Sequence, residues 1–74
     1  MIVQLKYDNF DYDAESILRE KLENISHEFE GSGFCLETQT RDIGIKVKNK
    51  KIANIVAKTM KQVFKGYNPV IKIR

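Results

Sequence analysis

Two hydrophobic periodicities alternate along this chain, and their order limits its fold more than any other feature. Apolar residues recur at every second position in four short segments, which is typical of strands that bury one face. Two longer stretches between them carry apolar residues at spacings of three and four, which is typical of amphipathic helices. The expected order of elements is therefore strand, helix, strand, strand, helix, strand.

The first half of the chain contains the first three predicted elements. Residues 2–7 alternate and predict a strand. Asp13 is a suitable N-cap residue, and the pattern after it predicts a helix of about four turns that runs to Phe29. Gly31 has the usual place of a residue that ends a helix. Residues 34–39 then alternate and predict the second strand.

The second half contains the other three predicted elements. Residues 40–42 predict a short turn, and residues 43–48 alternate as the third strand, so these two strands should form a hairpin. Asn49 is expected to cap a second helix, which Gly66 ends. Residues 70–74 predict the last strand.

This order of elements is that of the ferredoxin-like fold. We therefore expect an α+β domain in which two helices cover one face of a four-stranded antiparallel sheet and the other face meets solvent. Its length predicts that residues 1–74 form one domain. The strand residues expected to face the core are Val3, Leu5, Tyr7, Phe34, Leu36, Thr38, Ile43, Ile45, Val47, Ile71 and Ile73.

Composition excludes several classes of protein. A single cysteine, Cys35, excludes an internal disulfide framework and cysteine-rich metal sites. No apolar run approaches the roughly 18 residues of a membrane span, and no signal peptide is visible. We therefore expect a cytoplasmic protein with no membrane partner.

An acidic loop is the first candidate for chemistry. Asp8, Asp11 and Asp13 lie close together in sequence, with Glu15 just after them, and carboxylate oxygens suit Mg²⁺ or Ca²⁺. Helix capping and attraction to the positive helix N-terminus account for the same residues, so we expect no metal. Tyr7 and Asp8 at the end of the first strand resemble the small CRISPR-adaptation endonucleases, which would imply a metal-dependent nuclease as a remote alternative.

The remaining reactive side chains form no recognisable catalytic set. His27 is expected on the solvated side of the first helix, and Cys35 on an outward strand face. No acid, base and nucleophile converge in the pattern, so we expect neither an enzyme nor a cofactor. The outward positions of the first and third strands hold no aromatic residue of the kind with which RNA-recognition motifs stack on bases.

Charge is distributed very unevenly. Residues 1–40 hold nine acidic and three basic groups, whereas residues 41–74 hold ten basic groups and one acidic group, Asp42. Part of this asymmetry is expected to be compensated between the helices, with Lys58, Lys61 and Lys65 beside an acidic first helix. Glu28 and Glu30, at the expected end of that helix, are predicted to lie near the start of the second helix.

The other basic residues have no such predicted partner. The open sheet face is expected to carry Lys6, Lys46, Lys48, Lys72 and Arg74, opposed by Glu37 alone. A site for an anionic partner is therefore predicted at Lys6, Lys46, Lys48, Lys50, Lys51, Lys72 and Arg74.

The leading hypothesis is a small binding module, an adaptor or inhibitor of the kind that phages and mobile elements encode. It would dock on an acidic protein or nucleoprotein surface. The alternative is a protein that binds RNA or DNA directly through phosphates. Either outer strand could also pair with a second copy of the chain, and the sequence does not decide the oligomeric state.

Overall fold

The sheet and helices follow the predicted order. The computed structural model describes residues 1–74. The elements are β1 (Ile2–Asp8), α1 (Tyr12–Lys21), β2 (Glu28–Cys35), β3 (Thr40–Lys46), α2 (Lys50–Val63) and β4 (Val70–Ile73). The strands form one sheet in the order β2-β3-β1-β4, with every neighbouring pair antiparallel.

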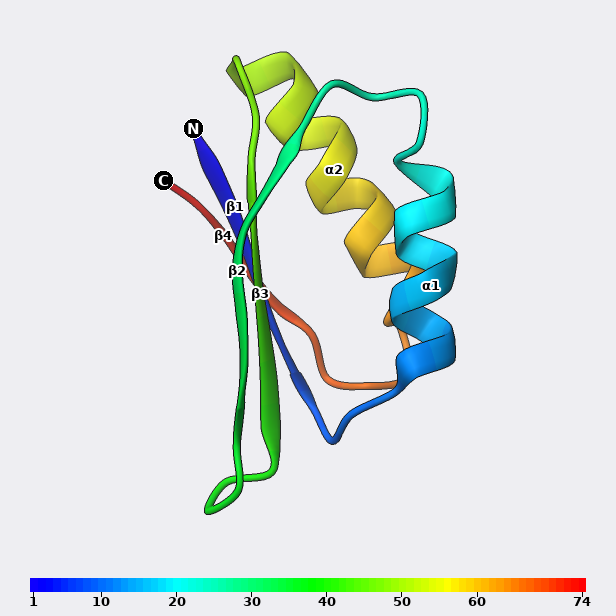
Figure 1. Cartoon of the computed structure of the whole chain (residues 1–74), viewed down its shortest axis with the longest axis vertical. Helices are drawn as coiled ribbons and strands as arrows, with labels where there is room; N and C mark the ends of the chain where they lie inside the picture. The colour runs from blue at the N-terminus through cyan, green and yellow to red at the C-terminus, as the bar shows by residue number, and fades with distance from the viewer.

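The molecule has two layers (Figure 1). Both helices lie on the same side of the sheet, and the other face of the sheet is uncovered. This arrangement, with the element order and the antiparallel sheet, confirms an α+β domain consistent with the ferredoxin-like fold. The β2–β3 hairpin extends beyond the helices at one end of the molecule, so its outer part is covered by neither helix.

The core lies between the sheet and the two helices. Its side chains from β1 and β3 confirm the predicted alternation, because Val3, Leu5 and Tyr7 are buried and the positions between them are not. Period-2 alternation places such residues on one face, and here the helices cover that face. The buried core residues are Val3, Leu5, Tyr7, Ala14, Leu18, Leu22, Ile43, Ile45, Val47, Ala53, Val56, Met60 and Phe64.

The first helix is shorter than predicted and begins earlier. Its N-cap is Asp11, because the Asp11 Oδ1 atom accepts a hydrogen bond from the backbone N–H of Ala14 at 3.0 Å. Asp13 lies inside the first turn, so its prediction as the cap is wrong. The helix ends at Lys21, with Leu22 as its C-cap, and not near Phe29.

The second strand lies earlier in the chain than predicted. Phe29 and Gly31 belong to β2 and not to a helix end, and the hairpin turn spans residues 36–39. Phe34 and Leu36, which were expected in the core, are 40% and 81% exposed. They are exposed because β2 is an edge strand whose hairpin extends past the helices.

A bulge in β2 lies opposite Gly44 of β3. The register of β2 against β3 shifts between Phe29 and Gly31, so Glu30 and Gly31 together oppose Gly44. A Cβ atom on Gly44 would lie 3.5 Å from the Cβ atom of Glu30. This is an ordinary van der Waals distance, so the bulge does not crowd Gly44.

The second helix matches its prediction closely. Asn49 is its N-cap and accepts a hydrogen bond from the backbone N–H of Ile52 at 3.0 Å. The helix ends at Val63, shortly before Gly66. The Ile71 and Ile73 side chains of β4 pack against the core and are partly buried. Neither α1 nor α2 has the length and apolar character that crossing a membrane requires.

The corrected cap gives a direct test. Replacing Asp11 by alanine should lower the thermal unfolding midpoint measurably, because the N–H of Ala14 and the hydroxyl of Tyr67 both lose their acceptor. Asp13→Ala is the matched control and should change the midpoint much less. Circular dichroism melts of both variants provide the measurement. A larger effect at Asp13 would contradict the cap assignment.

Candidate binding surface

A set of buried and partly buried polar side chains joins four parts of the fold. Arg41 donates two hydrogen bonds to Glu15, at 2.7 Å from Nε and 2.9 Å from Nη2. The hydroxyl of Tyr7 donates to the same carboxylate at 2.5 Å and accepts from the backbone N–H of Asp11 at 3.3 Å. The hydroxyl of Tyr67 donates to the Asp11 carboxylate. We call these five residues the Glu15 clasp. It connects β1, α1, β3 and the segment before β4.

The clasp fixes the protonation states of its members. Burial acts to raise the pKa of Glu15, but hydrogen bonds from Arg41 and Tyr7 outweigh it, so this pKa lies below its usual value. Burial, followed by the hydrogen bond to Glu15, raises the pKa of Tyr7. Glu15 is therefore ionised and Tyr7 neutral near pH 7. No buried side-chain nitrogen or oxygen in the protein lacks a hydrogen-bond partner, so the clasp is fully satisfied.

The acidic loop does not converge on one point. Asp8 accepts a hydrogen bond from the side-chain amide of Asn68 at 2.9 Å. Asp11 caps α1, and Glu15 pairs with Arg41. Three or more histidine, cysteine, aspartate or glutamate side chains nowhere gather closely enough to hold a metal ion.

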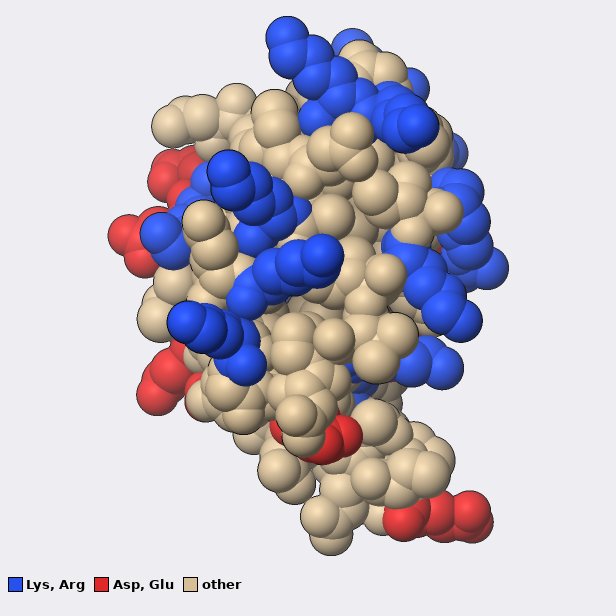
Figure 2. Space-filling model, turned by 180° about the vertical axis from the view of Figure 1, so that it is seen from behind, with Lys and Arg blue, Asp and Glu red and all other residues tan.

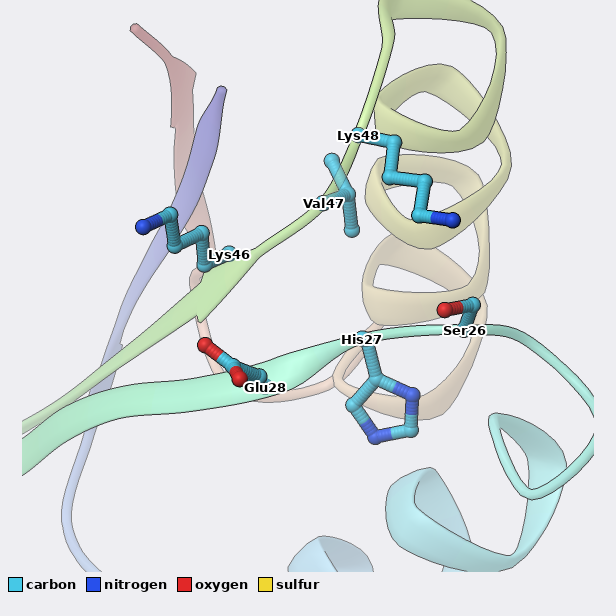
Figure 3. Close-up of a pocket in the computed structure, with 6 residues that line it drawn as sticks. All are labelled: Ser26, His27, Glu28, Lys46, Val47 and Lys48. Atoms are coloured by element: carbon cyan, nitrogen blue, oxygen red, sulfur yellow. The ribbon is translucent and has the colours of Figure 1, made fainter.

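The lone histidine lies outside the helix to which it was assigned. His27 precedes β2, and its Nδ1 atom contacts the backbone carbonyl of Ile25 at 2.5 Å. It lines an open pocket of about 210 Å³ together with Ser26, Glu28, Lys46, Val47 and Lys48. Figure 3 shows that Lys46 points to one side of this pocket and Lys48 to the other. Its charged groups therefore do not converge on a common ligand.

The cysteine is accessible at the end of the hairpin. Cys35 is the last residue of β2 and is exposed. Hydrogen bonds from the side chain and backbone of Thr38 lower the pKa of its thiol. No other sulfur or histidine accompanies it in the hairpin turn.

The outer sheet face is more mixed in charge than predicted. Asp42 lies directly opposite Lys6, and Glu28 lies directly opposite Lys46, so both acids share this face with the lysines. The expectation that Glu37 alone would oppose the basic residues is therefore wrong. The acids come from β2 and β3, which leaves the β1 and β4 side of the face basic.

The predicted binding residues divide into separate groups. Lys6 and Lys72 line one shallow hollow on the outer face, together with Gln4 and Val70. Lys48 lies beyond the end of β3 at Lys46 and points away from the direction of Lys46 (Figure 3), so it does not lie on that face. The exposed Lys50 and Lys51 begin α2, at the end of the helix away from Gly66.

Charge compensation between the helices is not observed. The only ion pair in the protein joins Arg41 to Glu15, and no lysine of α2 pairs with α1. Glu28 and Glu30 lie in β2, so their predicted place at the end of the first helix is wrong. The lysines of α2 are therefore available to a partner.

Two of those lysines face β4 across a groove. The groove has a volume of about 310 Å³ and is lined by Asn54, Ala57, Lys58, Lys61, Ile71 and Ile73. We call it the β4 groove. Figure 2 shows this side of the molecule, where basic side chains lie on both sides of an uncharged strip and acidic side chains lie mostly at the margins.

The basic residues around β4 form one surface, which we call the basic edge. On the helix side it has Lys58 and Lys61, and on the outer side it has Lys6, Lys72 and Arg74. The sequence pattern predicts the outer three as binding residues, but it predicts that Lys58 and Lys61 are compensated by the first helix. The strand order and the groove bring these residues together, and the sequence pattern shows neither of them. A scan against protein-family models and a search of curated proteins found no match to this chain.

Proposed function

We propose that this chain is a small non-enzymatic binding module that docks on an acidic surface of a partner protein, as an adaptor or inhibitor. The basic edge carries the proposal. No acidic residue lines either the β4 groove or the hollow beside Lys6 and Lys72. These two depressions are therefore locally basic, although Asp42 lies opposite Lys6 on the β3 side. A locally basic surface attracts an acidic partner from a distance and orients its approach.

The chemistry of the groove favours a protein over a nucleic acid. Half of its lining residues, Ala57, Ile71 and Ile73, are apolar, and an apolar lining suits a side chain better than a phosphate. Single-stranded nucleic acids are usually held by stacked aromatic side chains. The outer face offers Ile2, Gln4 and Gly44 at the positions that such side chains would need.

Direct RNA or DNA binding is the second candidate. Lys6, Lys72 and Arg74 are exposed on neighbouring strands, and a row of such side chains can contact successive phosphates. Binding of this kind would be insensitive to sequence. Its affinity would fall by about 0.7–0.9 log units per contact for each tenfold rise in salt.

The test compares two charge-reversed variants of the purified chain. Lys6→Glu with Lys72→Glu reverses the outer part of the basic edge, and Lys50→Glu with Lys51→Glu makes the same change of charge at the start of α2. Binding to poly-glutamate, mixed-sequence RNA and duplex DNA is measured by fluorescence anisotropy at low and high salt. We expect the first variant to bind poly-glutamate about tenfold or more weakly than the second.

Two outcomes would contradict this proposal. Equal weakening by both variants would show that net charge acts without a defined surface. Salt-sensitive binding to RNA or DNA with none to poly-glutamate would favour the nucleic-acid candidate.

A further inference from the structure

We infer that the β4 edge receives an extended acidic segment of the partner as an added antiparallel strand, with one apolar side chain of that segment in the β4 groove. This inference rests on the proposed function and specifies the form of the partner. It predicts a linear motif in which acidic and apolar residues alternate.

The hydrogen-bond pattern of β4 leaves main-chain groups free along this edge. Ile2 and Arg74 exchange two backbone hydrogen bonds, at 2.6 Å and 2.9 Å. Such pairs alternate with non-bonded pairs in an antiparallel ladder. Lys72 therefore bonds to β1, whereas the N–H and C=O groups of Ile71 and Ile73 point to the open edge.

The same two residues direct their side chains toward α2. Ile71 and Ile73 line the β4 groove with Ala57 and are only partly buried. An added strand that bonds to their backbone would place its own side chain opposite Ile71 or Ile73 on this side. A groove of about 310 Å³ has room for an aliphatic side chain there.

The alternation of a strand then determines where its other side chains lie. The residues on each side of the apolar anchor point to the outer face, toward Lys72 and Lys6. Acidic residues fit those positions. Lys58 and Lys61 on the wall of the groove would attract further carboxylates at the margin. The motif is therefore acidic, apolar, acidic.

Charge also disfavours the simplest competing partner, which is the β4 edge of a second copy of this chain. Lysine on an edge strand normally discourages pairing with other strands. A second β4 edge would bring its own Lys72 and Arg74 against these residues, and like charges directly opposite one another destabilise a sheet. An acidic strand would instead place carboxylates opposite Lys72 and Arg74, where they attract. The β4 edge therefore favours an acidic strand over a second copy of itself.

The decisive experiment uses labelled peptides on the whole chain. One peptide alternates glutamate and valine, and its control has the same composition with the glutamates and valines in separate blocks. Fluorescence anisotropy should show the alternating peptide binding about tenfold or more tightly, because only it can fill the groove and satisfy the lysines together. Equal affinities would overturn strand addition, while the proposed docking on acidic surfaces would stand.

Methylation of the peptide backbone tests the hydrogen bonds. In an antiparallel ladder the valines opposite Ile71 and Ile73 donate their N–H groups to β4, whereas the glutamate N–H groups point away. N-methylation of the valines should therefore abolish tight binding. N-methylation of the glutamates should preserve it. If both N-methylated peptides still bound tightly, the peptide would not be added as a strand.

Variants of the chain locate the peptide. Lys61→Glu changes the lining of the β4 groove, and Lys65→Glu makes the same change of charge in the turn just after α2, outside the groove. We expect Lys61→Glu to weaken binding of the alternating peptide by about tenfold or more. Lys65→Glu should leave this binding unchanged. Equal effects of the two variants would place the peptide elsewhere.

Self-association is measured in parallel, because β2 contains Glu28-Phe29-Glu30, which has the same alternation. A strand of one copy on the edge of another would form an open chain of molecules and not a closed dimer. Sedimentation should show a monomer that binds peptide. The chain could instead form polymers at high concentration that the alternating peptide disperses. That result would identify a second copy of the chain as the occupant of the β4 edge and would overturn the proposed partner.

Discussion

Replacing Arg41 by alanine is expected to lower the free energy of unfolding by about 3–5 kcal/mol, because it leaves the Glu15 carboxylate buried without its countercharge. The two side chains are only 12% and 6% exposed. A small domain has a total stability of about 5–15 kcal/mol, so this one change removes a large part of it. Urea unfolding followed by circular dichroism measures the loss.

A second substitution separates two contributions to this loss of stability: the missing ion pair and the uncompensated carboxylate of Glu15. Glu15→Gln in the Arg41→Ala background removes the uncompensated carboxylate and should recover part of the stability. Lys65→Ala is the control for removing a basic side chain from the surface, and should cost little. A loss of only about 0–1 kcal/mol in Arg41→Ala would show that the pair behaves as a solvent-exposed one.

Acid should act on the wild-type protein through the same carboxylate. Hydrogen bonds from Arg41 and Tyr7 hold the pKa of Glu15 below its unfolded value despite burial. The stability that this group contributes is therefore present above its unfolded pKa and is lost as the pH falls toward the folded pKa. In Arg41→Ala the contribution of burial is no longer offset by the guanidinium, so acid unfolding should begin at a higher pH.

Replacing Phe64 by alanine is expected to cost about 3–5 kcal/mol, the usual range for a fully buried phenylalanine. Phe64 has no exposed surface, and its ring centroid lies 4.4 Å from that of Tyr7 and 5.9 Å from that of Tyr67. Its removal leaves a cavity beside the hydroxyl-bearing rings of the Glu15 clasp. Chemical denaturation at constant temperature provides the measurement.

Two further variants check the cause of that loss. Phe64→Leu keeps most of the volume and should cost less than the alanine variant. Ile55→Ala removes an aliphatic side chain that is 45% exposed on α2, and should cost much less again. A similar loss in Phe64→Ala and Ile55→Ala would contradict the assignment of Phe64 to the centre of the core.

Local patterns predicted the elements that pack directly against the helices. Val3, Leu5 and Tyr7 alternate without interruption, and the structure buries all three. The second helix was equally clear, since Asn49 precedes a stripe of apolar residues that ends just before a glycine. In both cases one face is buried and the other is not, which is the condition under which periodicity is informative.

The region between α1 and β2 was misassigned because two patterns coincide there. Leu22, Ile25 and Phe29 have helical spacing, yet Glu28, Phe29 and Glu30 also alternate as in a strand. Pairing with β3 decides in favour of the strand, and that pairing depends on residues more than ten positions away. A bulge at Glu30 disturbs the alternation further.

The Glu15 clasp and the β4 groove depend on separations that no local pattern contains. Arg41 and Glu15 are 26 positions apart, and Tyr67 and Asp11 are 56 positions apart. In the sequence, each of these four residues alone looks like an ordinary surface group. The groove likewise requires that β4 be the outermost strand beside α2, which only the strand order establishes.

The hairpin that extends past the helices gives the molecule two regions of unequal cooperativity. Every residue of β2 except the partly buried Gly33 is exposed, whereas β1 contributes three buried side chains to the core. Local unfolding is cheapest where few apolar contacts must break. We therefore expect the end of the hairpin to open at a lower free-energy cost than the core. Arg41, paired with Glu15 and 4.6 Å from the centroid of the Phe10 ring, connects the hairpin to the core.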